Sequence, residues 1–186
     1  MQVSFKAQLL NTPTIYKKNN DKFNQKQSVK FLEVDINSEE DYEAIREVGF
    51  SWQEGSSLAG DMLDMLAAQK YCTSANFCPS YRYFALTNQN DNRLTGDSIL
   101  GVASIRPDSE DTLTLQHLQV NPEQIYGSKT REYKHIGKAI LTSIIDLFPK
   151  KNIKLYPFTY DAEKFYEKFD FKKLPNSFYM MRKAKL

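Results

Sequence analysis

The sequence predicts an α/β (α+β) fold, with a mixed central sheet of six to seven strands, helices on both faces and one parallel strand–helix–strand unit. Three strand-like segments between residues 81 and 120 are joined by polar turns, which is typical of an antiparallel meander. The last of them leads through an apolar-periodic helix of about a dozen residues into a strand at 152–156, which is the pattern of a parallel crossover. The 186 residues are 41% hydrophobic, so they can build the core of a single domain.

Composition argues against several classes of protein. No run of about 18 apolar residues occurs, so no membrane span is expected. The net charge of +2 gives no argument for a nucleic-acid partner. The first six residues lack the layout of a signal peptide, so we expect a cytoplasmic protein with free thiols at Cys72 and Cys78. A redox role for these cysteines is disfavoured, because their spacing is not Cys-x-x-Cys.

The first 28 residues carry weak structural signals. Residues 3–10 alternate loosely and predict a strand, and residues 14–16 predict its hairpin partner after a break at Asn11-Thr12-Pro13. Residues 17–28 are almost entirely polar, and we expect them to form a solvated loop.

A strand at 29–36 precedes two helices. Asn37 or Ser38 can cap the first helix, which we expect to end at Gly49. The second helix is predicted from about Ser57 to Gln69, with methionines as core fillers on its apolar side. The meander then occupies residues 81–87, 99–105 and 112–120.

Residues 118–141 join the end of a strand to a basic turn and the start of a helix. The strand stops at Asn121-Pro122, and Gly137 opens a helix with an apolar side wide enough to lie against a sheet. A helix start presents unpaired N–H groups and the positive end of the helix dipole, so this turn predicts a site for a pyrophosphate-like anion. Four positive charges support the attraction of a polyanion, on Lys129, Arg131, Lys134 and Lys138.

The chain is predicted to close with a short helix and two strands. Asp161 is expected to cap this helix, which contains Phe165, Tyr166 and Phe169. The two strands are expected at 171–174 and 178–181, on either side of Pro175-Asn176.

Two motifs resemble those of the GNAT family, the GCN5-related N-acetyltransferases, and the resemblance covers roughly residues 29–183. Gln119-Val120-Asn121-Pro122, followed by Tyr133-Lys134-His135-Ile136-Gly137-Lys138-Ala139, is similar to the family's acyl-CoA loop, Gln/Arg-x-x-Gly-x-Gly/Ala. In one register His135 replaces the first glycine and Glu132 the Gln/Arg; in the other, Gly137 is the first glycine and Ala139 the last position. Residues 162–171 are similar to the family's Asn-x-x-Ala-x-x-Phe-Tyr-x-Lys-x-Gly-Phe, with Thr159 in place of Asn and Asp170 in place of Gly.

The resemblance implies an acyl-CoA-dependent N-acetyltransferase, which moves an acetyl group from acetyl-CoA to a primary amine by direct attack in a ternary complex, without a metal. Tyr166 matches the tyrosine that protonates the CoA sulfur in many members, and a phenol with a pKa of about 10 suits that role; ring packing is the alternative. The resemblance also implies an oxyanion donor on the backbone around Leu118 to Val120, where the strand splays from its parallel neighbour. The residues expected to bind the cofactor are Leu118, Gln119, Val120, Tyr133, Lys134, His135, Ile136, Gly137 and Lys138.

The general base and the acceptor amine are not identified by the sequence. Some family members carry a base where this chain has Thr114 and Gln116, and neither can take a proton near pH 7. His117 lies one residue off and, by strand alternation, on the other face, so a structural role is expected for it. The resemblance places the acceptor, a small molecule or a protein, along the first two helices and the last strands, which carry Trp52, Glu54, Asp61, Asp64 and Tyr179.

The domain organisation expected is a single GNAT-type domain over residues 1–186, with 1–28 as an extension outside the family match. The sequence leaves open whether the chain acts alone or as a homodimer. The alternative function is a catalytically weak GNAT-like regulator that binds acyl-CoA or a protein partner.

Overall fold

The main sheet of the computed structural model has eight strands, in the order β1-β4-β5-β6-β7-β9-β11-β10, one more than the sequence predicted. The structure describes residues 7–53, 57–72, 80–91, 93–125 and 127–184. Neighbouring strands are antiparallel except β7 and β9, which are parallel, so the sheet is mixed as expected. The strands are β1 (Gln8–Asn11), β4 (Lys30–Val34), β5 (Arg82–Thr87), β6 (Ile99–Ser109), β7 (Thr112–Val120), β9 (Asn152–Leu155), β10 (Lys172–Lys173) and β11 (Met180–Arg182).

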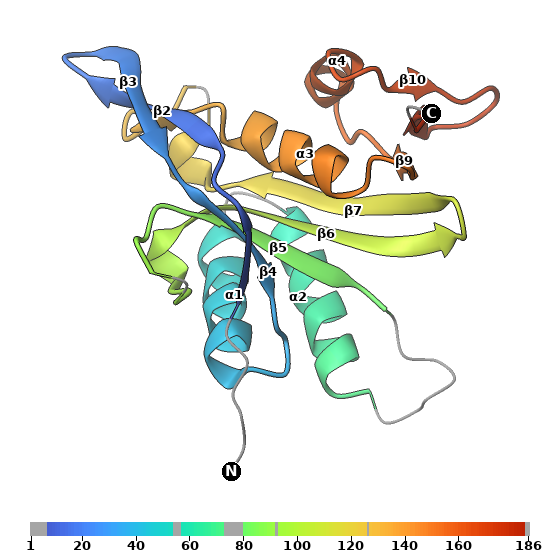
Figure 1. Cartoon of the computed structure of the whole chain (residues 1–186), viewed down its shortest axis with the longest axis horizontal. Helices are drawn as coiled ribbons and strands as arrows, with labels where there is room; N and C mark the ends of the chain where they lie inside the picture. Colours follow the sequence, from blue (N-terminus) through green and yellow to red (C-terminus); the bar gives the residue numbers. More distant parts are fainter. Residues whose placement is uncertain (1–6, 54–56, 73–79, 92, 126, 185–186) are drawn as a thin grey trace.

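Helices cover both faces of this sheet (Figure 1). Helices α1 (Glu39–Trp52) and α2 (Ser57–Lys70) lie on one face, and α3 (Ile136–Leu147) and α4 (Tyr160–Glu167) on the other. Two separate apolar clusters result, and adjacent residues of β4 enter different ones: Phe31 packs on the α3 side and Leu32 on the α1–α2 side. Within the described residues, no helix is long and apolar enough to cross a membrane.

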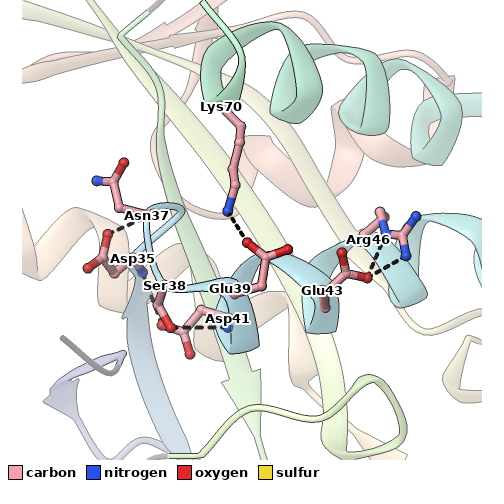
Figure 2. A network of polar contacts seen from close by, with 8 residues as sticks. All are labelled: Asp35, Asn37, Ser38, Glu39, Asp41, Glu43, Arg46 and Lys70. Carbon is pink, nitrogen blue, oxygen red and sulfur yellow. Dashed lines mark hydrogen bonds and ion pairs between the residues drawn. The ribbon is translucent and has the colours of Figure 1, made fainter. Parts of the chain in front are cut away.

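Polar contacts fix the start of α1 (Figure 2). Ser38 is the cap: its hydroxyl accepts the backbone N–H of Asp41 at 3.4 Å. Lys70 at the end of α2 forms an ion pair with Glu39 at 2.8 Å, which ties the two helices together. The Asp41 carboxyl is buried and accepts the backbone N–H of Asp35 at 3.2 Å.

Asp41 makes the stability of the fold depend on pH. Burial, opposed by a hydrogen bond from the backbone and reinforced by the charges of Asp35 and Glu40, raises the pKa of its carboxyl from 3.8 to about 6. The folded state therefore binds this proton more tightly than the unfolded state, and stability falls as pH rises from about 4 to about 6. At about 1.4 kcal/mol per pKa unit, the loss amounts to about 3 kcal/mol.

We expect Asp41→Asn to remove this dependence. The free energy of unfolding of wild type minus that of the variant should fall by about 3 kcal/mol between pH 4 and pH 7. Urea titrations across this range measure it, with Asp111→Asn on an exposed turn as the control. A difference that stays constant with pH would show that Asp41 keeps an ordinary pKa in the folded state.

Two helix ends differ from the sequence prediction. Gly49 does not end α1; a Cβ added there would lie 2.4 Å from Leu63 Cδ2, so the glycine instead permits the close approach of α2. The cap of α4 is Thr159, whose hydroxyl accepts the Ala162 N–H at 3.1 Å, and not Asp161. Phe169 lies beyond the end of α4.

The N-terminal segment also differs, because residues 17–28 do not form a loop. Strand β1 joins β4 at the edge of the main sheet, whereas β2 (Thr14–Asn19) pairs with β3 (Lys22–Ser28) in a second sheet. Their turn is the residue pair Asn20 and Asp21, both with positive φ, as a two-residue type I′ hairpin requires. Strand β2 also pairs with β8 (Tyr133–Lys134), directly before α3.

Candidate active site

A cavity of about 570 Å³ opens where β7, the following loop, α3 and α4 meet. Its wall combines apolar side chains with three cations, a composition typical of a site for a ligand with apolar and anionic parts. The lining residues are Leu118, Val120, Gln124, Ile125, Arg131, Lys134, His135, Ile136, Gly137, Lys138, Asp161, Ala162, Phe165 and Tyr166.

Most of the residues expected at a cofactor site line this cavity, and two do not. Gln119 is buried outside the lining. Tyr133 is also buried; its N–H donates to Gln124 Oε1 at 2.9 Å, and its hydroxyl accepts from Asn88 Nδ2 at 3.4 Å. The same Gln124 oxygen accepts the N–H of Glu132 at 2.9 Å, so Gln124 holds the basic loop in place. Sequence reasoning missed Gln124, because an ordinary glutamine after Asn-Pro carries no distinguishing signal.

The start of α3 provides backbone donors at the cavity. The first helical hydrogen bond runs from the Ala139 N–H to the His135 carbonyl at 2.9 Å. The N–H groups of Ile136, Gly137 and Lys138 precede it and are available to an anion. His135 has a φ of 71°, a region that glycine favours, as expected for the register in which it replaces the first glycine.

The positive charge at this helix start comes from Arg131, Lys134 and Lys138 and not from His135. Burial lowers the pKa of the His135 imidazole, and the charges of Lys134, Lys138 and Arg131 lower it further. His135 is therefore neutral at pH 7, and its ring meets that of Tyr16 edge to face at 5.3 Å. A contact to phosphate from His135 remains a proposal, and it would be a neutral N–H donor there.

Aromatic rings of the β2–β3 hairpin support two of these cations. The guanidinium carbon of Arg131 lies 5.0 Å from the centre of the Phe23 ring, and Lys134 Nζ lies 5.7 Å from the same ring. Lys134 Nζ is also 5.8 Å from the Tyr16 ring. The extension that lay outside the family resemblance therefore orients cations at the cavity.

If the cavity binds the acetyl-CoA that the resemblance implied, Phe23→Ala is expected to weaken that binding about two- to fivefold, because an exposed cation–π contact is worth about 0.5–1 kcal/mol. Titration calorimetry measures the Kd. Phe50→Ala is the matched control, since Arg46 lies 5.7 Å from that ring on α1, away from the cavity. Equal affinity of the two variants would contradict a role of the hairpin in binding.

Strand β7 leaves its parallel neighbour beside the cavity. The pairing of β7 with β9 covers Thr112 to Leu115, opposite Asn152 to Leu155. Strand β9 ends at Leu155, so in the described part of the chain no pair beyond Leu115 joins these strands. The β9-facing backbone edge of residues 116–120 is therefore available to a ligand in the cavity.

A β-bulge overturns the argument from alternation about His117. Ser104 and Ile105, consecutive on β6, pair with His117 and Leu115, so Gln116 is an extra residue on β7. The bulge shifts the alternation by one residue. His117 therefore lines the same cavity as Thr114 and Gln116, instead of facing away from it.

That second cavity measures about 450 Å³ and is also lined by Asp61, Asp64, Met65, Leu115, Tyr156, Phe158 and Tyr179. Consecutive residues of β7 line the two cavities, His117 the second and Leu118 the first, so the cavities lie on opposite faces of this strand. His117 is buried, and its Nδ1 is 3.0 Å from Ser104 Oγ. Burial lowers the pKa of His117, and the charge of Asp61 opposes this, so the imidazole is neutral at pH 7.

The structure brings together only some of the residues expected around the acceptor. Asp61, Asp64 and Tyr179 line the second cavity, whereas Trp52 is buried elsewhere and Glu54 lies outside the described residues.

Tyr166 reaches the first cavity from α4. Its ring packs against Phe165 at 5.2 Å and Phe171 at 5.7 Å, and burial raises the pKa of its hydroxyl to about 12. Among the described residues, none forms a hydrogen bond with this hydroxyl. Tyr166 is therefore a protonated donor at the cavity across the physiological pH range.

The expectation of free thiols is wrong at Cys72, which is disulfide-bonded. Absence of a recognisable signal peptide was a weak guide to the state of this residue. The other cysteine of the sequence, Cys78, lies outside the described residues.

Solved structures that resemble this chain include acetyltransferases of the GNAT family. An acetyltransferase of this family from Staphylococcus aureus Mu50 has a TM-score of 0.54 at 16% identity, over 84% of this chain and 99% of that chain. The PaiA N-acetyltransferase of Thermoplasma acidophilum, solved in complex with coenzyme A, has a TM-score of 0.52 at 17% identity, over 86% and 100%. Ard1 of Thermoplasma volcanium has a TM-score of 0.54 at 16% identity, over 85% and 99%.

These likenesses confirm the GNAT fold that the two sequence motifs predicted. No family model matches the sequence, and no curated protein matches it significantly. At such low identities these likenesses establish the fold alone.

Proposed function

We propose that this chain is an acyl-CoA-dependent N-acetyltransferase, which moves the acetyl group of acetyl-CoA to a primary amine by direct attack in a ternary complex. The observation that carries the proposal is the first cavity. It combines the free N–H groups of a helix start, three cations and an unpaired strand edge, which together match the anionic and extended parts of acyl-CoA. The PaiA structure, which contains coenzyme A, supports this reading of the fold.

The proposed roles follow from position. The N–H groups of Ile136, Gly137 and Lys138 bind the pyrophosphate, with Lys134 and His135 beside it. The pantetheine lies along the β9-facing edge of Leu118 to Val120, and an N–H of this stretch stabilises the oxyanion. Tyr166 donates a proton to the departing thiolate. None of these steps requires a metal ion.

We further propose that residues 1–186 form one domain, in which the N-terminal extension belongs to the cofactor site. The pairing of β2 with β8 and the rings of Tyr16 and Phe23 beside the cations support this. A cytoplasmic location is retained as a proposal.

The test is release of free thiol from acetyl-CoA in the presence of a panel of primary amines, with mass spectrometry of the acetylated products. Amine-dependent thiol release and a matching acetylated product are expected. Binding of acetyl-CoA without turnover on any amine would instead favour the regulator alternative, and failure to bind acetyl-CoA would overturn the proposal.

A further inference from the structure

We propose that the second cavity binds the acceptor, that this acceptor is an alkylamine with a second cationic group, and that His117 takes the proton from the reacting amine. This inference rests on the proposed function and names the substrate class and the base of the same reaction. Free polyamines and adjacent lysine side chains share the required chemistry.

The charge of the second cavity is opposite to that of the first. Asp61 and Asp64 line it from α2, and no lysine or arginine is among its lining residues. Both side chains are three residues apart on one helix, which places them on the same face. Within the described residues neither forms an ion pair with a lysine or arginine. Two uncompensated carboxylates favour a ligand with two positive charges over one with a single charge.

Aromatic rings form the outer wall of this cavity. Tyr156 lies 5.2 Å from Phe158 and 6.0 Å from Tyr179, measured between ring centres. All three side chains are more than 40% exposed, and Lys154 Nζ already lies 5.2 Å from the centre of the Tyr179 ring, which shows that this wall accommodates an ammonium group. Ring faces attract alkylammonium groups and also pack against the methylene groups between them. The wall therefore suits an amine on an alkyl chain.

A buried hydroxyl that has no hydrogen-bond partner among the described residues also lines the second cavity. Thr114 is 4% exposed and lines the cavity, and its Oγ1 has no hydrogen-bond partner among the described residues. An unpaired buried hydroxyl costs free energy that a bound amine would recover, because an ammonium N–H can donate to it. This oxygen lies on the same strand as His117, three residues away.

His117 can accept a proton in one of its two neutral tautomers. With Nδ1 next to Ser104 Oγ at 3.0 Å, the tautomer that donates from Nδ1 leaves the lone pair on Nε2. Asp61 and Asp64 of α2, with Tyr156 and Tyr179, are the titratable groups that share the cavity with it. The adjacent residue, Leu118, lines the cofactor cavity on the opposite face of β7, so this strand separates the proposed amine from the proposed thioester by its own thickness, and the attack has to pass its unpaired edge.

The proton and bond balance is complete with these groups. Nε2 takes one proton from the ammonium, and the neutral nitrogen attacks the thioester carbonyl carbon to form the C–N bond. The C–S bond then breaks and the thiolate takes the Tyr166 proton. The tyrosinate recovers a proton from the new amide nitrogen, and His117 releases its own to solvent. One amide, one thiol and one proton result.

Acceptor selectivity provides the first test. We expect a four-carbon diamine to be acetylated with a higher kcat/KM than the matching monoamine, and the matching amino acid with a distal carboxylate to be the poorest. Asp61→Asn and Asp64→Asn should each lower kcat/KM for the diamine about ten- to hundredfold, the range for a hydrogen bond to a charged group. Asp111→Asn is the matched control. The kcat/KM for a peptide with adjacent lysines, compared with that for the free diamine, shows whether the acceptor is a protein side chain or a free polyamine.

The second test is the pH profile of His117→Gln, which keeps a partner for Ser104 but cannot take a proton. Near neutral pH, kcat/KM should fall about a hundredfold and recover as the pH approaches the pKa of the amine. A uniform loss at every pH would assign His117 a structural role and overturn this part.

Calorimetry with acetyl-CoA distinguishes failure of this inference from failure of the proposed function. If acetyl-CoA binds and is consumed, but the three four-carbon acceptors react equally, the acceptor inference fails and the acetyltransferase assignment stands. If acetyl-CoA does not bind to wild type, both fail.

Discussion

Replacing Gly137 with Glu is expected to abolish acetyl-CoA binding while the chain stays folded. A Cβ at this position would lie 3.5 Å from Val120 Cγ2 and 3.6 Å from Leu118 Cδ2, which are ordinary contacts. The backbone therefore accepts a side chain, and a carboxylate in the first turn of α3 interacts favourably with the helix dipole. The same carboxylate fills the cavity and repels the pyrophosphate. Thermal melts should show no destabilisation, whereas calorimetry should detect no binding.

Three variants separate the causes of this loss. Gly137→Ala should bind within about tenfold of wild type, because its methyl group makes only ordinary contacts. Gly137→Gln matches Glu in size, so the difference between them measures the repulsion of the charge. Gly60→Glu is the control, as a Cβ there meets nothing within 4 Å on a different helix. Wild-type affinity of Gly137→Glu would remove the start of α3 from the cofactor site.

The sequence predicted those parts of the fold in which burial gives the apolar residues a regular spacing along the chain. The apolar side of α3 could be predicted because it faces the core, where Ile140 and Ile144 are fully buried. The strands before and after this helix could be predicted for the same reason. The helix start at Ile136 is marked by a glycine in a basic turn. Together with the two motifs that resemble the GNAT family, these local signals predicted the fold and most of the lining of the first cavity.

The β2–β3 hairpin could not be predicted from the sequence, because it is held by strand pairing and its strands bury few side chains. Strands β2 and β3 are mostly exposed, so they show no apolar alternation and resemble a solvated loop. Asn20 and Asp21 do tolerate the left-handed conformation that a tight hairpin needs, and this was the available clue. The position of Phe23 beside Arg131 and Lys134 depends on that pairing and was equally hidden.

The side of β7 on which His117 lies was hidden by a single inserted residue. Strict alternation places positions 116 and 117 on opposite faces, and the bulge at Gln116 shifts that pattern by one residue. Bulges arise from the pairing of two strands, and β7 alone carries no sign of one. The contrast between a cationic cavity at Leu118 and an anionic cavity at His117 therefore appears only in the folded chain.

Replacing Tyr166 with Phe is expected to lower kcat about a hundred- to ten-thousandfold, the range for general acid catalysis, with little change in acetyl-CoA affinity. The hydroxyl acts mainly in the transition state, when charge develops on the sulfur, so its loss falls on the chemical step. The pKa of about 12 keeps this hydroxyl protonated between pH 6 and 9, so the loss should be similar across that range.

Packing makes a different prediction for the same residue. The Tyr166 ring lies against Phe165 and Phe171, so Tyr166→Ala should destabilise the fold by about 3–5 kcal/mol, whereas Tyr166→Phe should not. Tyr160→Phe, a largely exposed tyrosine on the same helix, is the matched control and should leave kcat unchanged. Steady-state kinetics and thermal melts on the three variants separate the two roles. Full activity of Tyr166→Phe between pH 6 and 9 would leave Tyr166 as a packing residue and require another group, or water, to protonate the thiolate.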